Sequence, residues 1–239
     1  MTWSILVRDP ATGALGAAVA SRFFAVGGLC IHVEGGVAAL ATQALVNPMY
    51  AVHAMPRLRA GAAAQDVLRS LVDPDPLRDQ RQFHILDASG AIAQHSGRDC
   101  VSWAGHVHGH SAGQDVSVAG NMLAAQPVVQ ATLEGYLAGR GSMAERLLSA
   151  MEAGEAAGGD KRGRQSAGLK ICTSDPYPDL DIRSDDHPDP LADLRRLHRI
   201  SLERYAVFRR FLAGRDSQWG ESDRTVIDAA IARDGRPLT

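Results

Sequence analysis

Apolar residues at the start of the chain occur in short runs bounded by turn-forming residues, a pattern typical of β-hairpins. The first two runs, 3–8 and 15–21, are separated by Asp9-Pro10-Ala11-Thr12-Gly13, in which proline and glycine favour a turn. The next two, 29–33 and 37–42, flank Glu34-Gly35-Gly36. The sequence therefore predicts two consecutive hairpins at the start of the fold.

Helical and strand patterns then alternate in groups. Residues 48–71 carry alanine, leucine and methionine at helical spacing, interrupted at Pro56 and Gly61, which predicts two short helices. A third hairpin is expected at 82–86 and 91–95, followed by a glycine- and histidine-rich loop and a strand at 115–119. Helices are expected at 127–138 and 142–156, the second with a capping box between Ser142 and Glu145. Two strands, 166–173 and 180–183, precede an amphipathic helix at 190–212.

This order lacks the strict strand–helix alternation of a parallel doubly wound sheet. We predict an α+β fold, a four-layer αββα sandwich in which paired helices cover two antiparallel sheets. The distribution of charged residues supports a buried N-terminal segment, since the first 60 residues hold six charged side chains and the last 61 hold 23. We expect a single domain over residues 1–213 that includes the helix 190–212, and a loosely held tail over 214–239.

Composition narrows the functional classes. With 239 residues, 45% apolar and 22% charged, and a formal net charge of -2, the chain is expected to be globular. Its three cysteines make no disulfide framework, and no run approaches a signal peptide or membrane helix, so we expect a cytoplasmic protein without membrane partners. Arginines are interleaved with acidic residues, which disfavours nucleic acid. Apolar residues surround much of the helix 190–212, which favours a homo-oligomer, a dimer.

Thr2 is the first candidate for chemistry. A methionine followed by a small residue is usually removed, which would place a threonine hydroxyl beside its own α-amine. An α-amine with a pKa of about 7.7 to 8.0 can act as a base at neutral pH, so one residue would supply nucleophile and proton acceptor. The alternative is that Met1-Thr2 is an ordinary N-terminus, in which case the base is an amide and this mechanism fails.

A glycine-rich stretch, 158–166, is the second candidate, because Asp160, Arg162, Arg164 and Gln165 fall within six positions. An arginine oriented by an aspartate binds carboxylates, so the stretch is predicted to hold an anionic substrate group beside Thr2. The alternative is a helix cap followed by surface ion pairs.

Further polar residues and the cysteines are candidates for which a structural role is also expected. Asn121 could present an amide to a developing oxyanion, although asparagine at such a position also caps helices. His106, His108 and His110 are flanked by glycines and are expected in a mobile loop without a metal. Residues 185–190 are expected to cap the last helix. Cys30, Cys100 and Cys172 are expected to be unreactive packing residues.

Taken together, the segments 2–5, 18–27, 42–44, 120–123, 157–167 and 185–190 resemble the bacterial and archaeal family catalogued as domain of unknown function 1028. The resemblance covers about residues 2 to 200. It implies membership of the N-terminal nucleophile (Ntn) aminohydrolase superfamily and its αββα sandwich. No enzymatic activity is assigned to the family.

The resemblance also implies roles for individual residues. In the proteasome branch of that superfamily the nucleophilic threonine begins the first strand, as Thr2 does here, and Ala20-Ser21-Arg22 resembles that branch's second motif with alanine in place of the acid. The branch also uses a lysine on the next strand, whereas no lysine here precedes Lys161. Arg22 could supply part of the electrostatic role by keeping the pKa of the α-amine low.

The sequence therefore predicts an Ntn-type amidohydrolase that cleaves an amide bond in a small anionic substrate, without cofactor or metal. Thr2, Arg22, Asn121 and Asp160 are the expected catalytic residues, and Gln43, Arg162 and Gln165 the expected substrate-binding residues. One alternative is a non-catalytic ligand-binding or assembly module on the same fold. Another is a metal-dependent hydrolase that uses the histidine run or Asp185-Asp186-His187.

Overall fold

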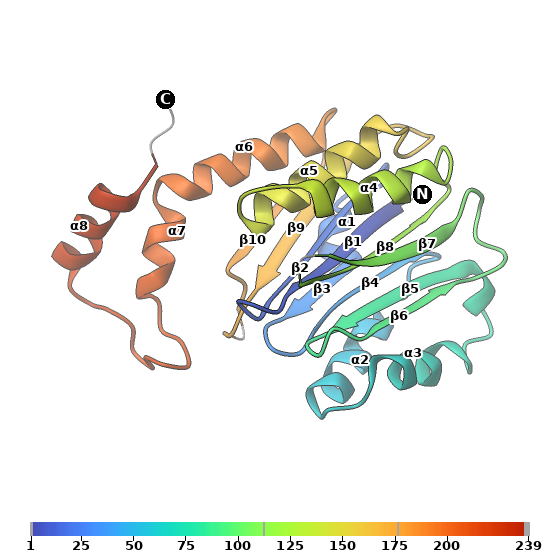
Figure 1. The fold of residues 1–239 in the computed structure, drawn as a ribbon, viewed down its shortest axis with the longest axis horizontal. Helices are drawn as coiled ribbons and strands as arrows, with labels where there is room; N and C mark the ends of the chain where they lie inside the picture. The colour runs from blue at the N-terminus through green and yellow to red at the C-terminus, as the bar shows by residue number, and fades with distance from the viewer. Residues whose placement is uncertain (1, 112, 176, 237–239) are drawn as a thin grey trace.

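The computed structural model describes residues 2–111, 113–175 and 177–236, and it has four layers (Figure 1). Helices α4 (Pro127–Ala138) and α5 (Met143–Ala156) cover a six-stranded sheet. Helices α2 (Met49–Arg59) and α3 (Ala64–Val72) cover a four-stranded sheet on the opposite side. The predicted αββα sandwich is confirmed.

The larger sheet is antiparallel, with the order β10-β9-β2-β1-β8-β7. Its strands are β1 (Thr2–Asp9), β2 (Ala14–Ser21), β7 (Gly105–Ser111), β8 (Gln114–Asn121), β9 (Ser166–Cys172) and β10 (Leu180–Ser184). Because β1 lies between β2 and β8, its first residue, Thr2, is opposite both Ser21 and Asn121. Segments far apart in the sequence thus meet at the N-terminal end of β1.

The smaller sheet has the order β3-β4-β5-β6 and is also antiparallel. It consists of β3 (Ile31–Glu34), β4 (Ala38–Ala44), β5 (Arg81–Asp87), which follows the short helix η1 (Arg78–Gln80), and β6 (Ile92–Ser96). The three predicted hairpins correspond to β1–β2, β3–β4 and β5–β6, so the local turn signals identified them correctly.

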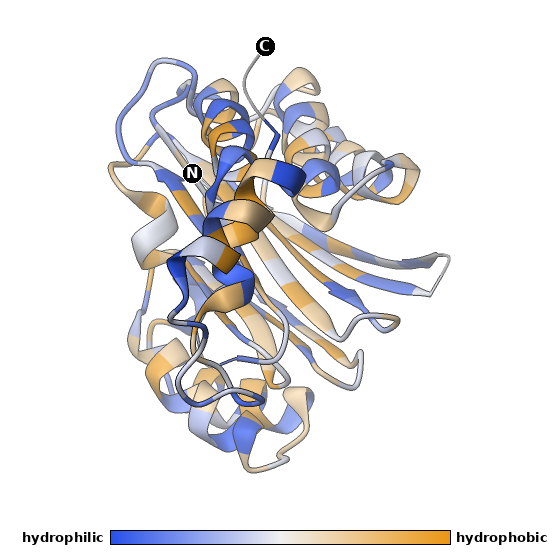
Figure 2. Ribbon diagram, turned by 90° about the vertical axis from the view of Figure 1, so that its left-hand side faces the viewer, coloured by the Kyte–Doolittle hydropathy of each residue, from blue (hydrophilic) through white to orange (hydrophobic). Residues whose placement is uncertain are grey.

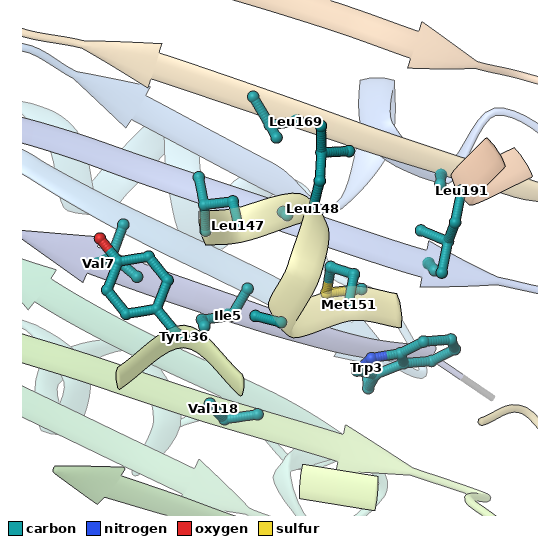
Figure 3. Packing of buried hydrophobic residues seen from close by; sticks show 14 of the residues in the cluster. Trp3, Ile5, Val7, Val118, Tyr136, Leu147, Leu148, Met151, Leu169 and Leu191 are labelled. Atoms are coloured by element: carbon teal, nitrogen blue, oxygen red, sulfur yellow. The ribbon is translucent and has the colours of Figure 1, made fainter. Parts of the chain in front are cut away.

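Strand β2, and β1 as far as Val7, hold no charged residue because both faces of the larger sheet are covered there. Trp3, Ile5 and Val7 of β1 pack against α4 and α5 in one hydrophobic cluster (Figure 3). Leu6, on the opposite face of the same strand, belongs to a second cluster between the two sheets. This alternation follows from the two-residue repeat of a strand, and each fully buried large side chain contributes about 1.5–3 kcal/mol of hydrophobic stabilisation.

The short helix α1 (Val26–Leu29) lies against β9 because two glycines meet there. A Cβ atom added to Gly168 would lie 2.6 Å from the Cα atom of Gly27. Only residues without side chains allow this approach, and it fixes the position of Val26.

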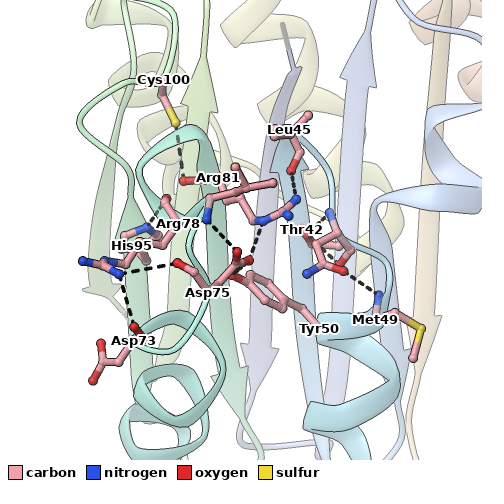
Figure 4. A network of polar contacts seen from close by, with 12 residues as sticks. Thr42, Leu45, Met49, Tyr50, Asp73, Asp75, Arg78, Arg81, His95 and Cys100 are labelled. Carbon is pink, nitrogen blue, oxygen red and sulfur yellow. Dashed lines mark hydrogen bonds and ion pairs between the residues drawn. The ribbon is translucent and has the colours of Figure 1, made fainter.

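A partly buried ion pair ties the segment between α3 and β5 to the smaller sheet (Figure 4). Nε of Arg81 lies 2.6 Å from Oδ2 of Asp75, which also accepts a 2.7 Å hydrogen bond from the Tyr50 hydroxyl. Arg81 donates a further 2.6 Å bond from Nη1 to the carbonyl oxygen of Leu45. The pair therefore also holds the loop that follows β4.

The histidine-rich segment is a strand, so the expectation of a mobile loop is wrong. β7 pairs with β8, which lies next to it in the sheet. Its glycines serve close packing: a Cβ at Gly109 would lie 3.3 Å from a side-chain carbon of Leu133 on α4, and one at Gly105 would lie 2.6 Å from the Trp103 ring.

The C-terminal region differs from the expected single helix. Helix α6 (Pro190–Glu203) is followed by α7 (Tyr205–Phe208), η2 (Arg209–Phe211) and α8 (Arg224–Asp234). The part after Glu203, which we call the C-terminal arm (204–236), projects from the sandwich (Figure 1) and shows hydrophobic colour on its helices (Figure 2). Within the described residues, no helix is both long enough and apolar enough to cross a membrane.

Candidate active site

Thr2 lies at the junction of three neighbouring strands and is largely buried. Its Oγ1 donates a 3.1 Å hydrogen bond to Oγ of Ser21, the last residue of β2. The backbone alternation of β1 directs Trp3 toward the helices, so Thr2 points toward the space between the sheets. The expected cleavage site before Thr2 involves Met1, which lies outside the described residues.

A cavity of about 240 Å³ opens beside Thr2. Its polar lining comes from Thr2, Ser21, Gln43 and Arg162. The remaining walls are mainly apolar and come from α1 and the residues beside it, the end of β4 with the loop that follows, and the residue after β8: Phe23, Val26, Leu29, Cys30, Ala44, Val46 and Met122. A predicted nucleophile and a predicted carboxylate-binding residue thus line one cavity.

Arg162 is held in place by Asp160. Nη2 and Nε of Arg162 lie 3.1 and 3.3 Å from the carboxylate oxygens, and the main-chain N–H of Arg162 donates a 2.8 Å bond to Oδ1. The Asp160 side chain is only 1% exposed, whereas that of Arg162 is 38% exposed. Asp160 therefore fixes a partly exposed guanidinium group that lines the cavity.

Asp160 also connects this loop to the end of β2. Its Oδ2 accepts a 2.8 Å hydrogen bond from the main-chain N–H of Arg22. The Arg22 guanidinium in turn donates to the carbonyl oxygen of Arg162. Asp160 and Arg22 are thus brought together near Thr2, and both contact the loop that carries Arg162.

The two predicted amide side chains converge on the main chain of Thr2. Nδ2 of Asn121 lies 3.3 Å, and Nε2 of Gln43 lies 3.4 Å, from the carbonyl oxygen of Thr2. Both amides also donate to Oε1 of Gln82, at 3.1 and 2.6 Å. These contacts fix the first residue of β1 from the side of the smaller sheet.

Gln165 is not brought to this cavity. Together with Arg22, Arg164, Asp186 and His187 it lines a separate surface pocket of about 290 Å³. Its Nε2 lies 3.2 Å from Oδ1 of Asp186. Its neighbour Arg164 forms ion pairs with Glu155 and Asp189.

A buried polar layer between the sheets was missed by the sequence reasoning. His84 of β5 lies between Oγ of Ser4, 2.9 Å from Nε2, and Oγ of Ser117, 2.7 Å from Nδ1. Ser4 donates a 2.8 Å bond to Oε1 of Gln43, which joins His84 to the Thr2 end of β1. The available signal was the two-residue spacing of Thr2 and Ser4 in the first strand.

Burial lowers the pKa of His84 to about 3, and the charge on nearby His106 adds to the effect. His84 is therefore neutral at physiological pH. The same network continues through Gln82, whose Nε2 lies 2.7 Å from Oγ of Ser96, and Ser96 lies 2.9 Å from Nδ1 of His106. A continuous set of hydrogen bonds thus runs from the Thr2 carbonyl to the exposed edge of the sandwich.

The cavity wall also contains unusual backbone conformations. Ala44 (φ 67°) and Met122 (φ 58°) line the cavity, and Ala25 (φ 53°) immediately precedes the lining residue Val26. They are the only non-glycine residues in the described ranges with positive φ. Such conformations cost roughly 1–3 kcal/mol each and cluster at functional sites, which supports the choice of this cavity.

The cysteines, residues 185–190 and the histidine run were weaker candidates. Burial raises the pKa of the Cys30 thiol to about 12 and that of Cys172 to about 11, and it also raises the pKa of Cys100, so all three remain thiols at neutral pH. Asp189 accepts a 3.1 Å bond from the N–H of Ala192, so the cap predicted for the helix that begins at Pro190 is confirmed. Among the described residues, no group of three or more histidine, cysteine or acidic side chains is arranged to hold a metal.

Fold and site together define an αββα sandwich with a threonine at the start of a central strand and an anchored arginine in the same cavity. The chain belongs to the family described as "Family of unknown function (DUF1028)", which matches residues 2–194. This membership confirms the resemblance drawn from the motifs.

Two solved structures are similar to this chain. A crystal structure of a DUF1028 protein from Silicibacter pomeroyi has a TM-score of 0.84 and 28% sequence identity, and the match covers 93% of this chain and 99% of that one. Anbu (ancestral beta-subunit) from Yersinia bercovieri has a TM-score of 0.40 and 11% identity, with 84% of this chain and 94% of that chain covered. No curated protein matches the chain.

Proposed function

We propose that this protein is an amidohydrolase that uses Thr2 as an N-terminal nucleophile and cleaves an amide bond in a small anionic substrate. The observation that supports the proposal most is that Thr2, the first residue of a central strand, lines the same cavity of about 240 Å³ as Arg162. A substrate carboxylate held by Arg162 would bring a neighbouring amide bond within the same small space.

The proposed reaction requires removal of the residue before Thr2. The freed α-amine accepts the hydroxyl proton as Oγ1 attacks the amide carbon. The C–N bond then breaks, the departing amine takes the proton, and an ester to Thr2 remains. Water, activated by the same α-amine, hydrolyses the ester to a carboxylic acid and restores Thr2.

The surrounding residues have supporting roles in this proposal. Arg162 binds the substrate carboxylate, and Asp160 orients Arg162 as a positioning residue. Arg22 supports this pair through its contacts with both. Asn121 and Gln43 fix the Thr2 main chain. Both N–H groups of the Asn121 amide already donate, to the Thr2 carbonyl and to Gln82, so we assign the oxyanion to backbone N–H groups.

Intact-mass measurement of the purified protein, combined with a screen of acylated amino acids, lactams and simple amides, tests the proposal. We expect protein that begins at Thr2 to release amine and Thr2→Ala to be inactive. Arg162→Ala should weaken transition-state binding of a carboxylate substrate by about 1 to 3 kcal/mol, the range for a lost charged hydrogen bond. Arg164→Ala is the matched control, since Arg164 lines the other pocket.

Activity in protein that retains the residue before Thr2 would refute the mechanism. Ligand binding without turnover in protein that begins at Thr2 would instead identify a ligand-binding module on the same fold.

A further inference from the structure

The cavity beside Thr2 has a polar part and a larger apolar part. Thr2, Ser21 and Gln43 are joined by hydrogen bonds, from Oγ1 of Thr2 to Ser21 and from Gln43 to the Thr2 carbonyl, so they form one polar cluster. The rest of the lining, apart from Arg162, comes from side chains that are largely apolar: Phe23, Val26, Leu29, Cys30, Ala44, Val46 and Met122. A ligand that fills this cavity must therefore be mostly apolar away from its reacting group.

Three exposed apolar residues belong to the segments that form the cavity wall. Phe23 is 52% exposed and its neighbour Phe24 is 63% exposed. Leu45, which lies between the wall residues Ala44 and Val46, is 44% exposed. We call Phe23, Phe24 and Leu45 the apolar rim. Phe23 lines the cavity, and Phe24 and Leu45 are exposed neighbours of wall residues in the sequence; exposed apolar residues of this size are typical of binding surfaces.

The apolar part of the cavity is preformed. The loop that carries Ala44, Leu45 and Val46 is fixed by the 2.6 Å bond from Arg81 to the Leu45 carbonyl. Thr42 and Asn47 bracket this loop with two 3.2 Å hydrogen bonds between side chain and main chain. The positive φ angles of Ala44 and Met122 maintain the wall at a conformational cost. An apolar surface held in this way favours ligands that match its volume.

The volume limits the size of that ligand. At about 30 Å³ for each water-sized group, a cavity of 240 Å³ holds about eight heavy atoms. Because the Arg162 side chain is 38% exposed, the amino-acid part of the ligand would lie largely outside this volume, which then matches a six- to eight-carbon acyl chain or one aromatic acyl group. Longer chains would have to extend over the apolar rim.

We propose that the substrate is an N-acyl amino acid with an apolar acyl group of medium length, which occupies the Val26–Val46–Met122 side of the cavity while Arg162 binds the amino acid's carboxylate. This inference rests on the proposed function. Attack by Thr2 forms an ester to the acyl group and releases the free amino acid, and water then releases the carboxylic acid.

A chain-length series tests the inference. N-acyl-L-alanines with acetyl, butyryl, hexanoyl, octanoyl and dodecanoyl groups are incubated with protein shown by intact mass to begin at Thr2, and released alanine is measured. We expect kcat/KM to rise about fourfold for each added methylene, the effect of burying one such group, and to level off near eight carbons. A profile that is flat or falls with chain length overturns the inference.

Two variants and one control test whether the preference for longer acyl chains arises in the cavity. Val46→Trp fills the apolar side and should remove the gain from acetyl to octanoyl. Val226→Trp, the same change at an exposed site on α8 in the C-terminal arm, should keep it. Since Val46→Trp could impair folding, Phe23→Ala at the exposed rim provides a second variant, which should lower kcat/KM for dodecanoyl-alanine several-fold more than for acetyl-alanine.

Binding to the Thr2→Ala variant, measured by calorimetry with octanoyl- and acetyl-alanine, separates this inference from the proposed function. Tighter binding of octanoyl-alanine with no turnover by wild-type protein supports the apolar acyl site and refutes the hydrolase. Turnover with no preference for chain length supports the hydrolase and refutes the acyl site. Equal binding of the two ligands to the variant also refutes the acyl site.

Discussion

Replacement of His84 by glutamine should remove a large part of the pH dependence of folding stability. His84 is fully buried between Ser4 and Ser117, and burial, with a contribution from His106, lowers its pKa to about 3. In the unfolded chain its pKa is about 6.5. Between these values the unfolded state binds a proton that the folded state does not, so stability must rise with pH and reach its full value above pH 6.5.

The magnitude follows from the difference in pKa. About 3.5 units at 1.4 kcal/mol per unit give about 5 kcal/mol of stability that is present above pH 6.5 and lost as the pH falls toward 3. One proton corresponds to a slope of about 1.4 kcal/mol per pH unit. Glutamine does not titrate, yet its amide can still hydrogen-bond to the serine hydroxyls.

The assay is urea unfolding of wild-type protein and the His84→Gln variant at intervals from pH 4 to 8. We expect the variant to be less stable than wild type at pH 7 and to lose less stability as the pH falls, so that the two curves converge. His53→Gln, the same change at an exposed position of α2, is the matched control and should leave the slope unchanged. Parallel curves for wild type and His84→Gln would refute the reasoning.

Three further predictions concern packing, ion pairing and assembly. Gly168→Ala should destabilise the protein by about 1 to 3 kcal/mol in urea unfolding, because the new Cβ overlaps Gly27; an unchanged midpoint would contradict the close approach. Asp75→Asn should cost about 1.5 to 3 kcal/mol in urea unfolding, because the partly buried Arg81 guanidinium loses its charged hydrogen-bond partner; an unchanged midpoint would count against this. Sedimentation at micromolar concentration should give a dimer that Tyr205→Glu disrupts, since Tyr205 lines an exposed groove of about 520 Å³; a wild-type monomer would refute it.

The parts of the fold predicted from the sequence are those fixed by local signals. The first hairpin was expected at 3–8 and 15–21 and is formed by Thr2–Asp9 and Ala14–Ser21. The capping box of α5 was predicted from Ser142 and Glu145, and both of its hydrogen bonds are present. Each of these features depends on residues a few positions apart, so neighbouring side chains carry enough information to identify it.

The missed strand β7 shows where local reasoning fails. Its glycines indicate a flexible loop when only neighbours in the sequence are considered. In the fold they allow Trp103 and helix α4 to approach the sheet, and β8 supplies the hydrogen-bond partners. A glycine that permits close packing and a glycine that permits a turn have the same sequence signal.

The candidate site was predicted in part for the same reason. Thr2 and Arg162 could be singled out by their own chemistry, and the structure places both at one cavity. The contacts of Gln82 and His84 depend on how two sheets face each other, which no local pattern specifies. Gln165 was grouped with Arg162 because it is three residues away, but the chain turns between them and Gln165 faces a different pocket.

The buried polar layer gives the end of β1 a unique register. A shift by one residue would move Thr2 to the helix-covered face and bring Trp3 into the space between the sheets. It would also leave the amides of Gln43 and Asn121 without the Thr2 carbonyl and would separate His84 from Ser4, and unpaired buried polar groups cost about 1 to 3 kcal/mol each. An apolar layer would penalise the shift less, because any apolar side chain of suitable size could fill it. The layer therefore holds the residue proposed as the nucleophile at the cavity wall.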